Sequence, residues 1–338
     1  MKKRITAGER SFLSGGRVIL FANPKAGAGE SGRVVTEVLR ELRERRFRAD
    51  LYTDPQQGFA EVSRWVDRCG GAPGEKDQEG GDGELVVVAA GGDGTMNLVA
   101  GGIPAGVPIV PFPLGTENLL ARHFGLTRGR KLRSAESIVS AVVAGRNHSI
   151  DAGEVSFLHA RSPARARRLM LLMLSAGFDA ETVRRVELGR RGHIRRWTYA
   201  KPILQMVRRY RYPPIVVRRG EGPSWGDALT VAWAFVFNLP CYATALRIEP
   251  EAEGADGLLN FCGFERGSHA ATLRYLMGIL TQRHMAWGDV PRELGARFLI
   301  SCERPLAVQI DGDYAGRLPV EIRVLPQRVT LRLPKESM

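Results

Sequence analysis

A glycine-rich segment of the chain could hold a phosphate group. It spans Gly91–Asn97 and directly follows the short apolar run Leu85–Ala90, which is typical of a buried strand. Three glycines around one aspartate let a ligand approach the backbone closely. Thr95 can cap a helix through Ala100 whose first N–H groups would favour a phosphate, and Asp93 offers a carboxylate to magnesium or a ribose hydroxyl. The segment predicts a nucleotide-binding turn, and a purely structural glycine turn is the alternative.

Two more segments combine an apolar strand, a polar loop and a helix in the same order. Their strands, loops and helices are expected at 18–22, 23–29 and 31–46, and at 108–112, 113–118 and 119–124. Because the carboxyl ends of successive parallel strands meet at one edge of a sheet, the three loops should lie together where open α/β sheets bind ligands. Lys25 is a compact cation suited to phosphate charge, with a solvated loop lysine as the alternative. None of the loops has the spacing of a P-loop or of Gly-x-Gly-x-x-Gly.

Two acidic tripeptides stand late in the chain. Asp311-Gly312-Asp313 ends the apolar run 306–310, and Asp256-Gly257-Leu258 precedes another apolar run. Carboxylates at such positions could accept a proton or hold a hard cation. An Asp-Gly pair is equally typical of a simple hairpin turn.

The elements that must position these residues are expected to form two domains. A chain of 338 residues can bury a substantial core, and we expect an α/β domain over 1–148 and a second domain over 149–338. Residues 70–83 carry almost no apolar side chains and are expected to form a mobile surface insertion. A strand from the C-terminus could return to the first domain.

Short apolar or alternating runs dominate the second domain. Strands are expected at 150–157, 169–176, 215–218, 229–237, 246–249, 258–264, 298–301, 306–310, 320–324 and 329–333, and helices at 180–187, 197–209 and 269–281. Many strands with few helices predict a mainly β sandwich.

Composition excludes several other classes of protein. The four cysteines are scattered without a Cys-x-x-Cys pair, which argues against a zinc site or a disulfide framework and favours a reducing cytosol. No apolar stretch reaches the ~20 residues of a membrane-spanning helix. No apolar region follows the basic residues 2–4, so we expect no signal peptide.

Positive charge is the strongest compositional feature, with a net charge of +13. Arginines cluster in three stretches that also contain aromatic side chains. The stretches span 161–168, 184–196 and 208–219, and the aromatic residues are Trp197, Tyr199, Tyr210 and Tyr212. Such a surface could attract anionic lipid headgroups or nucleic-acid phosphates, or could be a solvated face. No nucleic-acid-binding motif accompanies it.

These segments together resemble the catalytic domain of the diacylglycerol kinase and sphingosine kinase superfamily, which is related in fold to the NAD kinases. The resemblance covers nearly the whole chain, and its most specific part is the Gly-Gly-Asp-Gly-Thr element. The matching segments are, in order, 23–27, Thr53, 91–97, 115–118, 151–153, 177–180, 256–259 and 311–313. The resemblance implies an NAD-kinase-like α/β domain, a β sandwich and an active site in the cleft between them.

The resemblance also implies roles for individual residues. The ATP contacts would be Asn23, Pro24, Lys25, Ala26, Gly27, Thr53, Gly91, Gly92, Asp93, Gly94, Thr95, Met96, Asn97 and Thr116. The ligands of a structural Mg²⁺ would be Glu253, Asp256 and the carbonyl of Leu258. The base that accepts the hydroxyl proton would be Asp313, with Asp311 assisting or replacing it.

Several positions depart from the pattern of the family. Asp313 replaces the usual glutamate, which withdraws the carboxylate by about 1.5 Å. Leu119 replaces an aspartate of many bacterial members, although sphingosine kinases also lack it. Glu253 is not the typical metal ligand, and residues 243–245 stand where three glycines are usual. These departures leave the identity of the substrate open.

The sequence therefore predicts a cytoplasmic, peripherally membrane-associated lipid kinase that uses ATP and Mg²⁺. The acceptor would be diacylglycerol, a related glycerolipid or a sphingoid base. Because the family acts on lipids, we expect the arginine-rich surface to contact an anionic membrane and not nucleic acid. A soluble enzyme of the NAD-kinase type, and a nucleotide- or lipid-binding module without turnover, are the alternatives. The oligomeric state stays open, with a homodimer as one option.

Overall fold

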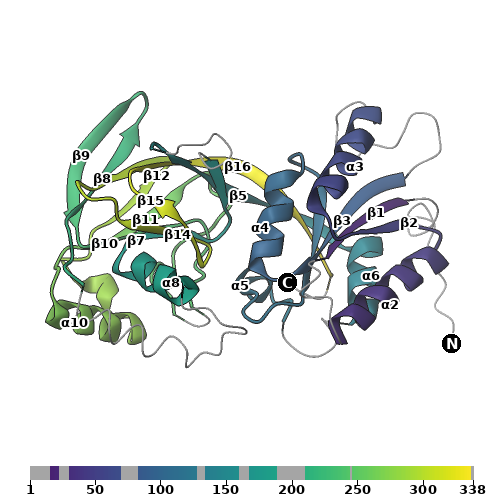
Figure 1. The fold of residues 1–338 in the computed structure, drawn as a ribbon, viewed down its shortest axis with the longest axis horizontal. Helices are drawn as coiled ribbons and strands as arrows, with labels where there is room; N and C mark the ends of the chain where they lie inside the picture. Colours follow the sequence, from purple (N-terminus) through teal and green to yellow (C-terminus); the bar gives the residue numbers. More distant parts are fainter. Residues whose placement is uncertain are drawn as a thin grey trace. The chain divides into compact units, whose positions relative to one another are not determined.

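The computed structural model describes residues 16–22, 30–69, 83–127, 134–159, 167–188, 210–243 and 246–335. The chain divides into two compact units, which are unit 1 (residues 1–150 and 327–338) and unit 2 (residues 151–326) (Figure 1). The predicted loop 23–29, nearly all of the predicted insertion 70–83 and the predicted helix 197–209 lie outside the described residues.

Unit 1 is built on a parallel sheet. Its strands stand in the order β2 (Arg48–Tyr52), β1 (Gly16–Ala22), β3 (Gly83–Gly91), β4 (Pro108–Pro113), followed by the C-terminal end of β16 (Val320–Leu333). Each neighbouring pair is parallel, including β16 with β4. The helices are α2 (Glu30–Glu44), α3 (Pro55–Arg68), α4 (Asp93–Gly102), α5 (Leu119–His123) and α6 (Ala135–Ala144).

The apolar runs of the sequence form the core of unit 1. Val18 and Leu20 of β1 and Val86 and Val88 of β3 are buried in one cluster with apolar side chains of α2 and α6. Parallel strands that are covered on both faces read as continuous apolar runs without alternation. The strands that lead into the polar loops could therefore be predicted from the sequence.

Unit 2 is a sandwich of two sheets. The strands of the first sheet stand in the order β16 (its beginning), β13 (Arg297–Ser301), β8 (Ile215–Glu221), β9 (Ser224–Val231). In the same sheet, β5 (Arg146–Phe157) pairs with β16 and with β6 (Arg167–Met170). The second is antiparallel, in the order β12 (Arg292–Gly295), β11 (Leu259–Phe264), β10 (Trp233–Phe237), β7 (Met173–Gly177), β14 (Ala307–Ile310), β15 (Asp313–Arg317). Helices α8 (Phe178–Leu188) and α10 (His269–Leu280) and the 3₁₀ helix η3 (Arg283–Ala286) complete unit 2.

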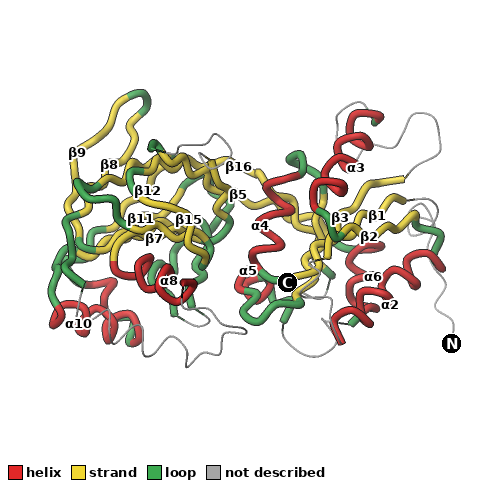
Figure 2. The backbone as a smooth tube through the Cα atoms, in the orientation of Figure 1, coloured by secondary structure: helices red, strands yellow, loops and turns green. Residues whose placement is uncertain are grey.

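Side chains from both sheets of unit 2 form a single core. It includes Phe298 and Ile322 from the first sheet and Leu174 and Phe261 from the second. Strands dominate this unit, whereas helices flank the sheet of unit 1 (Figure 2). The predicted fold class, an α/β domain with a parallel sheet and a mainly β sandwich, is confirmed.

The predicted strand 169–176 is wrong in its extent, because it consists of two strands. β6 ends at Met170 and β7 begins at Met173. Between them, the amides of Leu171 and Leu172 donate to the carboxylate of Asp311. A side chain distant in sequence thus takes the hydrogen bonds that would have continued the strand.

Other predicted strand limits are also wrong. The run 229–237 divides at Ala232 into the end of β9 and the whole of β10, which belong to different sheets. The runs 320–324 and 329–333 are parts of one strand, β16. The run 246–249 forms no strand and contributes a single bridge, although two of its residues are fully buried. The apolar runs of this unit therefore do not mark the limits of its strands.

Candidate active site

The Gly-Gly-Asp-Gly-Thr segment forms the turn between β3 and α4. β3 ends at Gly91, Gly92 is the N-cap and α4 begins at Asp93. The prediction that Thr95 caps this helix is therefore wrong. Thr95 lies in the first helical turn, and a Cβ on Gly91 would lie 2.1 Å from its Oγ1. Within the described part of the chain no side chain caps α4. The N–H groups of its first turn have no partner inside the helix and suit an anion.

The loop after β4 packs directly against this turn. The amides of Leu114 and Gly115 both donate to the carbonyl of Gly91, at 2.9 and 3.3 Å. A Cβ on Gly115 would lie 2.6 Å from the Cα of Gly92, a distance that real Cβ atoms do not show. The two glycines therefore permit a close approach of two backbones, and a larger residue would force the loops apart.

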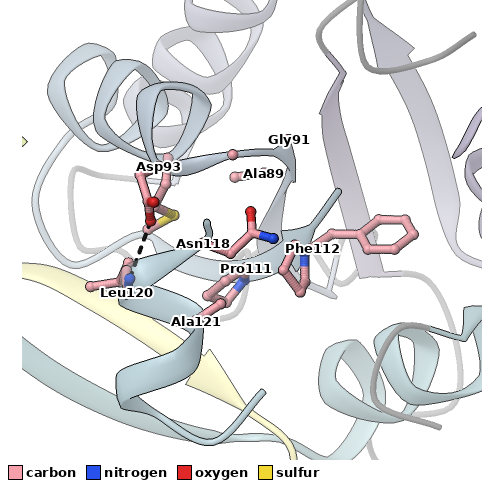
Figure 3. A pocket seen from close by; sticks show the side chains of 11 residues that line it. Ala89, Gly91, Asp93, Pro111, Phe112, Asn118, Leu120 and Ala121 are labelled. Atoms are coloured by element: carbon pink, nitrogen blue, oxygen red, sulfur yellow. Dashed lines mark hydrogen bonds between the residues drawn. The ribbon is translucent and has the colours of Figure 1, made fainter. Parts of the chain in front are cut away.

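Asp93 ties the two loops together through its side chain. Its carboxylate oxygens accept the amides of Leu119 and Leu120, at 2.9 and 3.1 Å, and Figure 3 shows the bond to Leu120. These are the first residues of α5, so Asp93 caps a helix that begins 26 residues later. Asn118 precedes α5 but does not cap it, because its side chain bonds the carbonyl and the amide of Gly115, at 2.6 and 3.1 Å.

The environment of Asp93 raises the pKa of its carboxyl group. Burial is the largest cause, and the neighbouring carboxylate of Glu117 acts in the same direction. The two amide hydrogen bonds and the guanidinium of Arg122 oppose this rise only in part. A cation bound beside Asp93 would stabilise its ionised form.

A small pocket lies between the same two loops. Asp93, Asn118, Leu120 and Ala121 are among the residues that line it (Figure 3). Its empty space is about 220 Å³, including the solvent at its mouth. Most of this space is open to solvent, and the part that a water molecule can enter is about 10 Å³, close to the room that one water needs. The pocket therefore does not define a nucleotide site by itself.

The remaining predicted ATP contacts of unit 1 are distributed around this turn. Thr116 is exposed in the loop after β4, and Met96 is buried beneath the turn in α4. Asn97 and the exposed Gly94 also lie in α4. Thr53 is exposed at the end of β2, on the same edge of the sheet, with β1 between β2 and β3. The predicted contacts Asn23, Pro24, Lys25, Ala26 and Gly27 lie outside the described residues.

Asp311 holds two segments of unit 2 together. Its carboxylate accepts the amides of Leu171, Leu172 and Met173, at 2.8, 2.8 and 3.0 Å. Its own amide donates to the Met173 carbonyl at 2.9 Å, and its φ of +52° lies in the left-handed region. These bonds join the β14–β15 hairpin to the connection between β6 and β7. They favour a structural role for Asp311 over the catalytic one that the sequence suggested.

Asp313 lies in a different environment from its neighbour Asp311. It is exposed at the first position of β15. An exposed carboxylate on a hairpin is accessible to a substrate hydroxyl. Of the two acids of the tripeptide, Asp313 is the exposed one, and its role as the proton acceptor stays a prediction.

A buried polar network adjoins this hairpin, and the sequence analysis missed it. Asp179 of α8 accepts hydrogen bonds from Ser175 at 2.5 Å, from Tyr242 and from Gln309 at 3.4 Å. Burial raises the pKa of Asp179, and these three donors only partly offset the rise. Gln309 in turn accepts the amide of Gly312 at 2.8 Å, so the network fixes the backbone of the Asp-Gly-Asp turn. Its members are far apart in sequence. Asp179 lies in the segment 177–180 that resembles the family, and that segment was the available signal for it.

The predicted metal ligands lie in one loop of unit 2. Glu253 and Asp256 are exposed, and Asp256 accepts the amide of Leu258 at 3.0 Å. The buried Asp151 accepts the amide of Gly257 at 2.7 Å and so anchors the loop. Among the described residues, no group of three or more His, Cys, Asp and Glu could hold a metal ion. A magnesium site here would need backbone carbonyls besides its two carboxylates, and it stays a prediction.

The described part of the arginine-rich surface is partly neutralised. Arg184 and Arg185 both pair with Glu181 of their own helix, at 2.7 and 3.0 Å. Tyr212 is buried and stacks on Phe178, with ring centroids 6.1 Å apart, so it cannot serve as an interfacial anchor. Within the described ranges, no helix is long and apolar enough to cross a membrane.

Comparison with known protein families decides which class this geometry represents. The model of the diacylglycerol kinase catalytic domain matches residues 17–155. The model of the YegS C-terminal NAD kinase beta sandwich-like domain matches residues 173–333. The chain belongs to the diacylglycerol kinase family. Membership of this kinase family makes the chain a phosphotransferase. Its two glycine loops fall in the first match, and its Asp-Gly-Asp hairpin falls in the second.

Relatives of this family member extend over most of its length. A diacylglycerol kinase of Mycobacterium tuberculosis (strain ATCC 25618 / H37Rv) is 25% identical over 256 residues, which cover 74% of this chain and 77% of the relative. One from Bacillus subtilis (strain 168) is 23% identical over 303 residues, covering 88% and 94%. The crystal structure of a diacylglycerol kinase from Bacillus anthracis str. Sterne has a TM-score of 0.59 at 14% identity and covers 95% of this chain and 98% of its own. This last likeness shows a shared fold.

Proposed function

We propose that this chain is an ATP-dependent lipid kinase, with diacylglycerol as the first acceptor to test. Membership of the diacylglycerol kinase family supports the class of reaction. The single observation that carries the nucleotide assignment is the N-terminus of α4. It has no side-chain cap within the described residues, and it lies where two glycine loops meet at the carboxyl edge of a parallel sheet.

Phosphoryl transfer demands mainly positioning and neutralisation of charge. The amides of the first turn of α4 would hold phosphate oxygens, and the glycine contact leaves room for a ligand to reach them. Asp93 would stand beside the magnesium that accompanies ATP, although it already binds α5. The lipid hydroxyl oxygen would bond to the γ-phosphorus, the bond from phosphorus to ADP would break, and Asp313 would take the hydroxyl proton.

Association with a membrane surface belongs to the same proposal. A water-insoluble acceptor is reached at a bilayer, and the chain carries a net charge of +13. Anionic lipid attracts basic residues near its surface by about 1 kcal/mol each. We therefore also propose that the enzyme is cytoplasmic and associates peripherally with membranes. If charge dominates this binding, sedimentation with phosphatidylserine vesicles falls as salt is raised.

The direct test is transfer of labelled γ-phosphate from ATP–magnesium to a panel of lipids in mixed micelles, with NAD as a soluble acceptor. We expect label on diacylglycerol or a related lipid. Asp313→Asn should lower the rate by about 10²- to 10⁴-fold, because it removes the proposed base. Asp227→Asn is the matched control, since Asp227 is also an exposed aspartate on a strand of unit 2.

Two results would contradict the proposal. Label on NAD and not on lipid would assign the chain to the soluble kinases of the related fold. ATP binding without transfer to any acceptor would make the chain a nucleotide-binding module. In that case the first variants to test would be Leu119→Asp and Asp313→Glu, which restore the acids usual in the family.

A further inference from the structure

Helix α10 carries large apolar side chains on two opposite faces. Its inner face, with Tyr275 and Ile279, is buried against the aromatic core of unit 2. Its outer face carries Leu273, Met277 and Leu280, which are 62%, 52% and 62% exposed. Spacings of four and three residues place these three side chains on one stripe of the helix. A surface helix normally carries polar residues on that side.

No other described element has such a stripe. The other large apolar side chains exposed within the described ranges lie on separate elements or loops. They are Leu51, Leu98, Leu158, Leu188 and Leu294. Isolated exposed leucines are ordinary, whereas neighbouring ones rimmed by polar residues mark a surface that binds something apolar. In Figure 1, α10 lies at the periphery of unit 2, outside its strands.

Arginines outnumber acidic residues around the stripe, where Asp289 and the exposed Glu265 are also present. α10 contains no acidic residue. Arg266, Arg274 and Arg283 are exposed beside it. Arg266 and Arg274 share the single carboxylate of Asp289, at 3.0 and 2.6 Å, so this cluster keeps a net positive charge. The arrangement of apolar side chains between arginines matches a helix that lies in the interface of an anionic membrane.

The helix is also held rigidly. Arg274 makes two hydrogen bonds to Asp289, and its guanidinium lies 3.9 Å from the ring centroid of Trp287. The hydroxyl of Tyr275 donates to the same carboxylate at 2.8 Å. A rigid helix presents its stripe without an ordering cost on binding.

We propose that the outer face of α10 docks on a lipid bilayer, with Leu273, Met277 and Leu280 inserted at the level of the acyl chains and the arginines among anionic headgroups. This inference rests on the proposed lipid kinase function for the identity of the occupant. A second copy of the chain is the weaker occupant, because two α10 faces would bring like-charged arginine clusters together. Insertion differs from attraction by charge alone, because its apolar part persists in high salt.

The test compares vesicle binding and turnover in the full chain. The test variant combines Leu273→Ser with Leu280→Ser and so removes the two most exposed side chains of the stripe. The control variant Leu158→Ser removes a single leucine elsewhere in unit 2 that is 51% exposed. We expect the double variant to bind phosphatidylcholine–phosphatidylserine vesicles about tenfold more weakly or worse, at low and at high salt. The single variant should bind as the parent does. Turnover of a monomeric short-chain diacylglycerol should be unchanged in both.

The outcomes separate this inference from the proposed function. Equal vesicle binding by parent and double variant overturns the inference, whatever the enzyme phosphorylates. A parent that is dimeric in solution and becomes monomeric in the double variant also overturns it, because a second copy then covers the face. A parent that binds vesicles through α10 but labels no lipid supports the docking surface and refutes the lipid-kinase assignment.

Discussion

Substitution by asparagine should affect the two acids of the Asp-Gly-Asp hairpin differently, because it should lower the stability of unit 2 at Asp311 and lower turnover at Asp313. Asp311→Asn replaces one carboxylate oxygen by an NH₂ group and removes the charge. Asparagine tolerates left-handed backbone, so the φ of +52° at this position is not an obstacle. The substitution therefore tests the hydrogen bonds to Leu171, Leu172 and Met173 without disturbing the turn.

The size of the effect follows from these bonds. An ionised acceptor contributes about 1.5–3 kcal/mol per hydrogen bond. One oxygen of Asp311 accepts Leu172 and Met173, and the other accepts Leu171. The asparagine oxygen can keep the first pair in weakened, uncharged form, but the NH₂ group would face the Leu171 amide. We expect the free energy of unfolding of unit 2 to fall by about 2–4 kcal/mol.

Hydrogen exchange measures this change at the amides concerned. A loss of about 2–4 kcal/mol corresponds to a roughly 30- to 700-fold faster exchange in a peptide that contains residues 171–173, if exchange follows opening of unit 2. Urea unfolding followed by tryptophan fluorescence gives an independent value. Asp313→Asn should leave both measurements within about 0.5 kcal/mol of the parent, because Asp313 is exposed, while it lowers turnover by about 10²- to 10⁴-fold. Unchanged exchange and unfolding in Asp311→Asn, together with lost turnover, would refute the structural assignment of Asp311.

Three further predictions concern packing and titration. Gly115→Ala should destabilise unit 1 by about 1–3 kcal/mol and weaken nucleotide binding, because its Cβ would lie 2.6 Å from the Cα of Gly92. The hydrogen bonds from Arg274 lower the pKa of Asp289 to about 2 from an ordinary value of 3.8. The stability that Asp289 contributes should therefore disappear as pH falls from about 4 to about 2. In acid titrations, Asp289→Asn should remove this dependence on pH. Burial raises the pKa of Asp179 above 3.8, so the parent should gain stability relative to Asp179→Asn as pH falls from neutrality toward 4 in urea titrations.

Each of these predictions has a control or a contrary result. Gly288→Ala adds a Cβ in open space and should be nearly neutral, so equal losses at both glycines would remove the packing argument. A parent and an Asp289→Asn variant that lose stability in parallel between pH 4 and 2 would show that other acids dominate that range. A constant difference between parent and Asp179→Asn across pH would mean that Asp179 titrates as it does in the unfolded chain.

The parallel sheet and the glycine loops could be predicted because their signals are local. β1, β3 and β4 are short and mostly apolar runs, and a helix follows each of them along the chain. A strand buried on both faces must be apolar along its length, and the loop that follows must be polar where it meets solvent or ligand. The order of these units along the chain then places the loops at one edge.

The functions of single acids could not be predicted, because their partners are distant in sequence. Asp311 breaks a strand about 140 residues earlier, through bonds to Leu171 and Leu172. Asp179 joins a network that includes Tyr242 and Gln309 from two other segments. The Asp-Gly-Asp motif therefore contains one acid with a structural role and one with a proposed chemical role, and only three-dimensional contacts distinguish the two.

The loop that departs most from its family shows how an acid can be lost without loss of the local structure. Position 119, an aspartate in many bacterial members, is leucine here, yet its backbone amide donates to Asp93 at 2.9 Å. That bond depends on the main chain and not on the side chain, so leucine preserves the junction between the two glycine loops. A second negative charge is still present nearby, because Glu117 raises the pKa of Asp93. The carboxylates that remain at this junction are those of Asp93 and Glu117, and the guanidinium of Arg122 lies beside them, so the local charge balance does not depend on an acid at position 119.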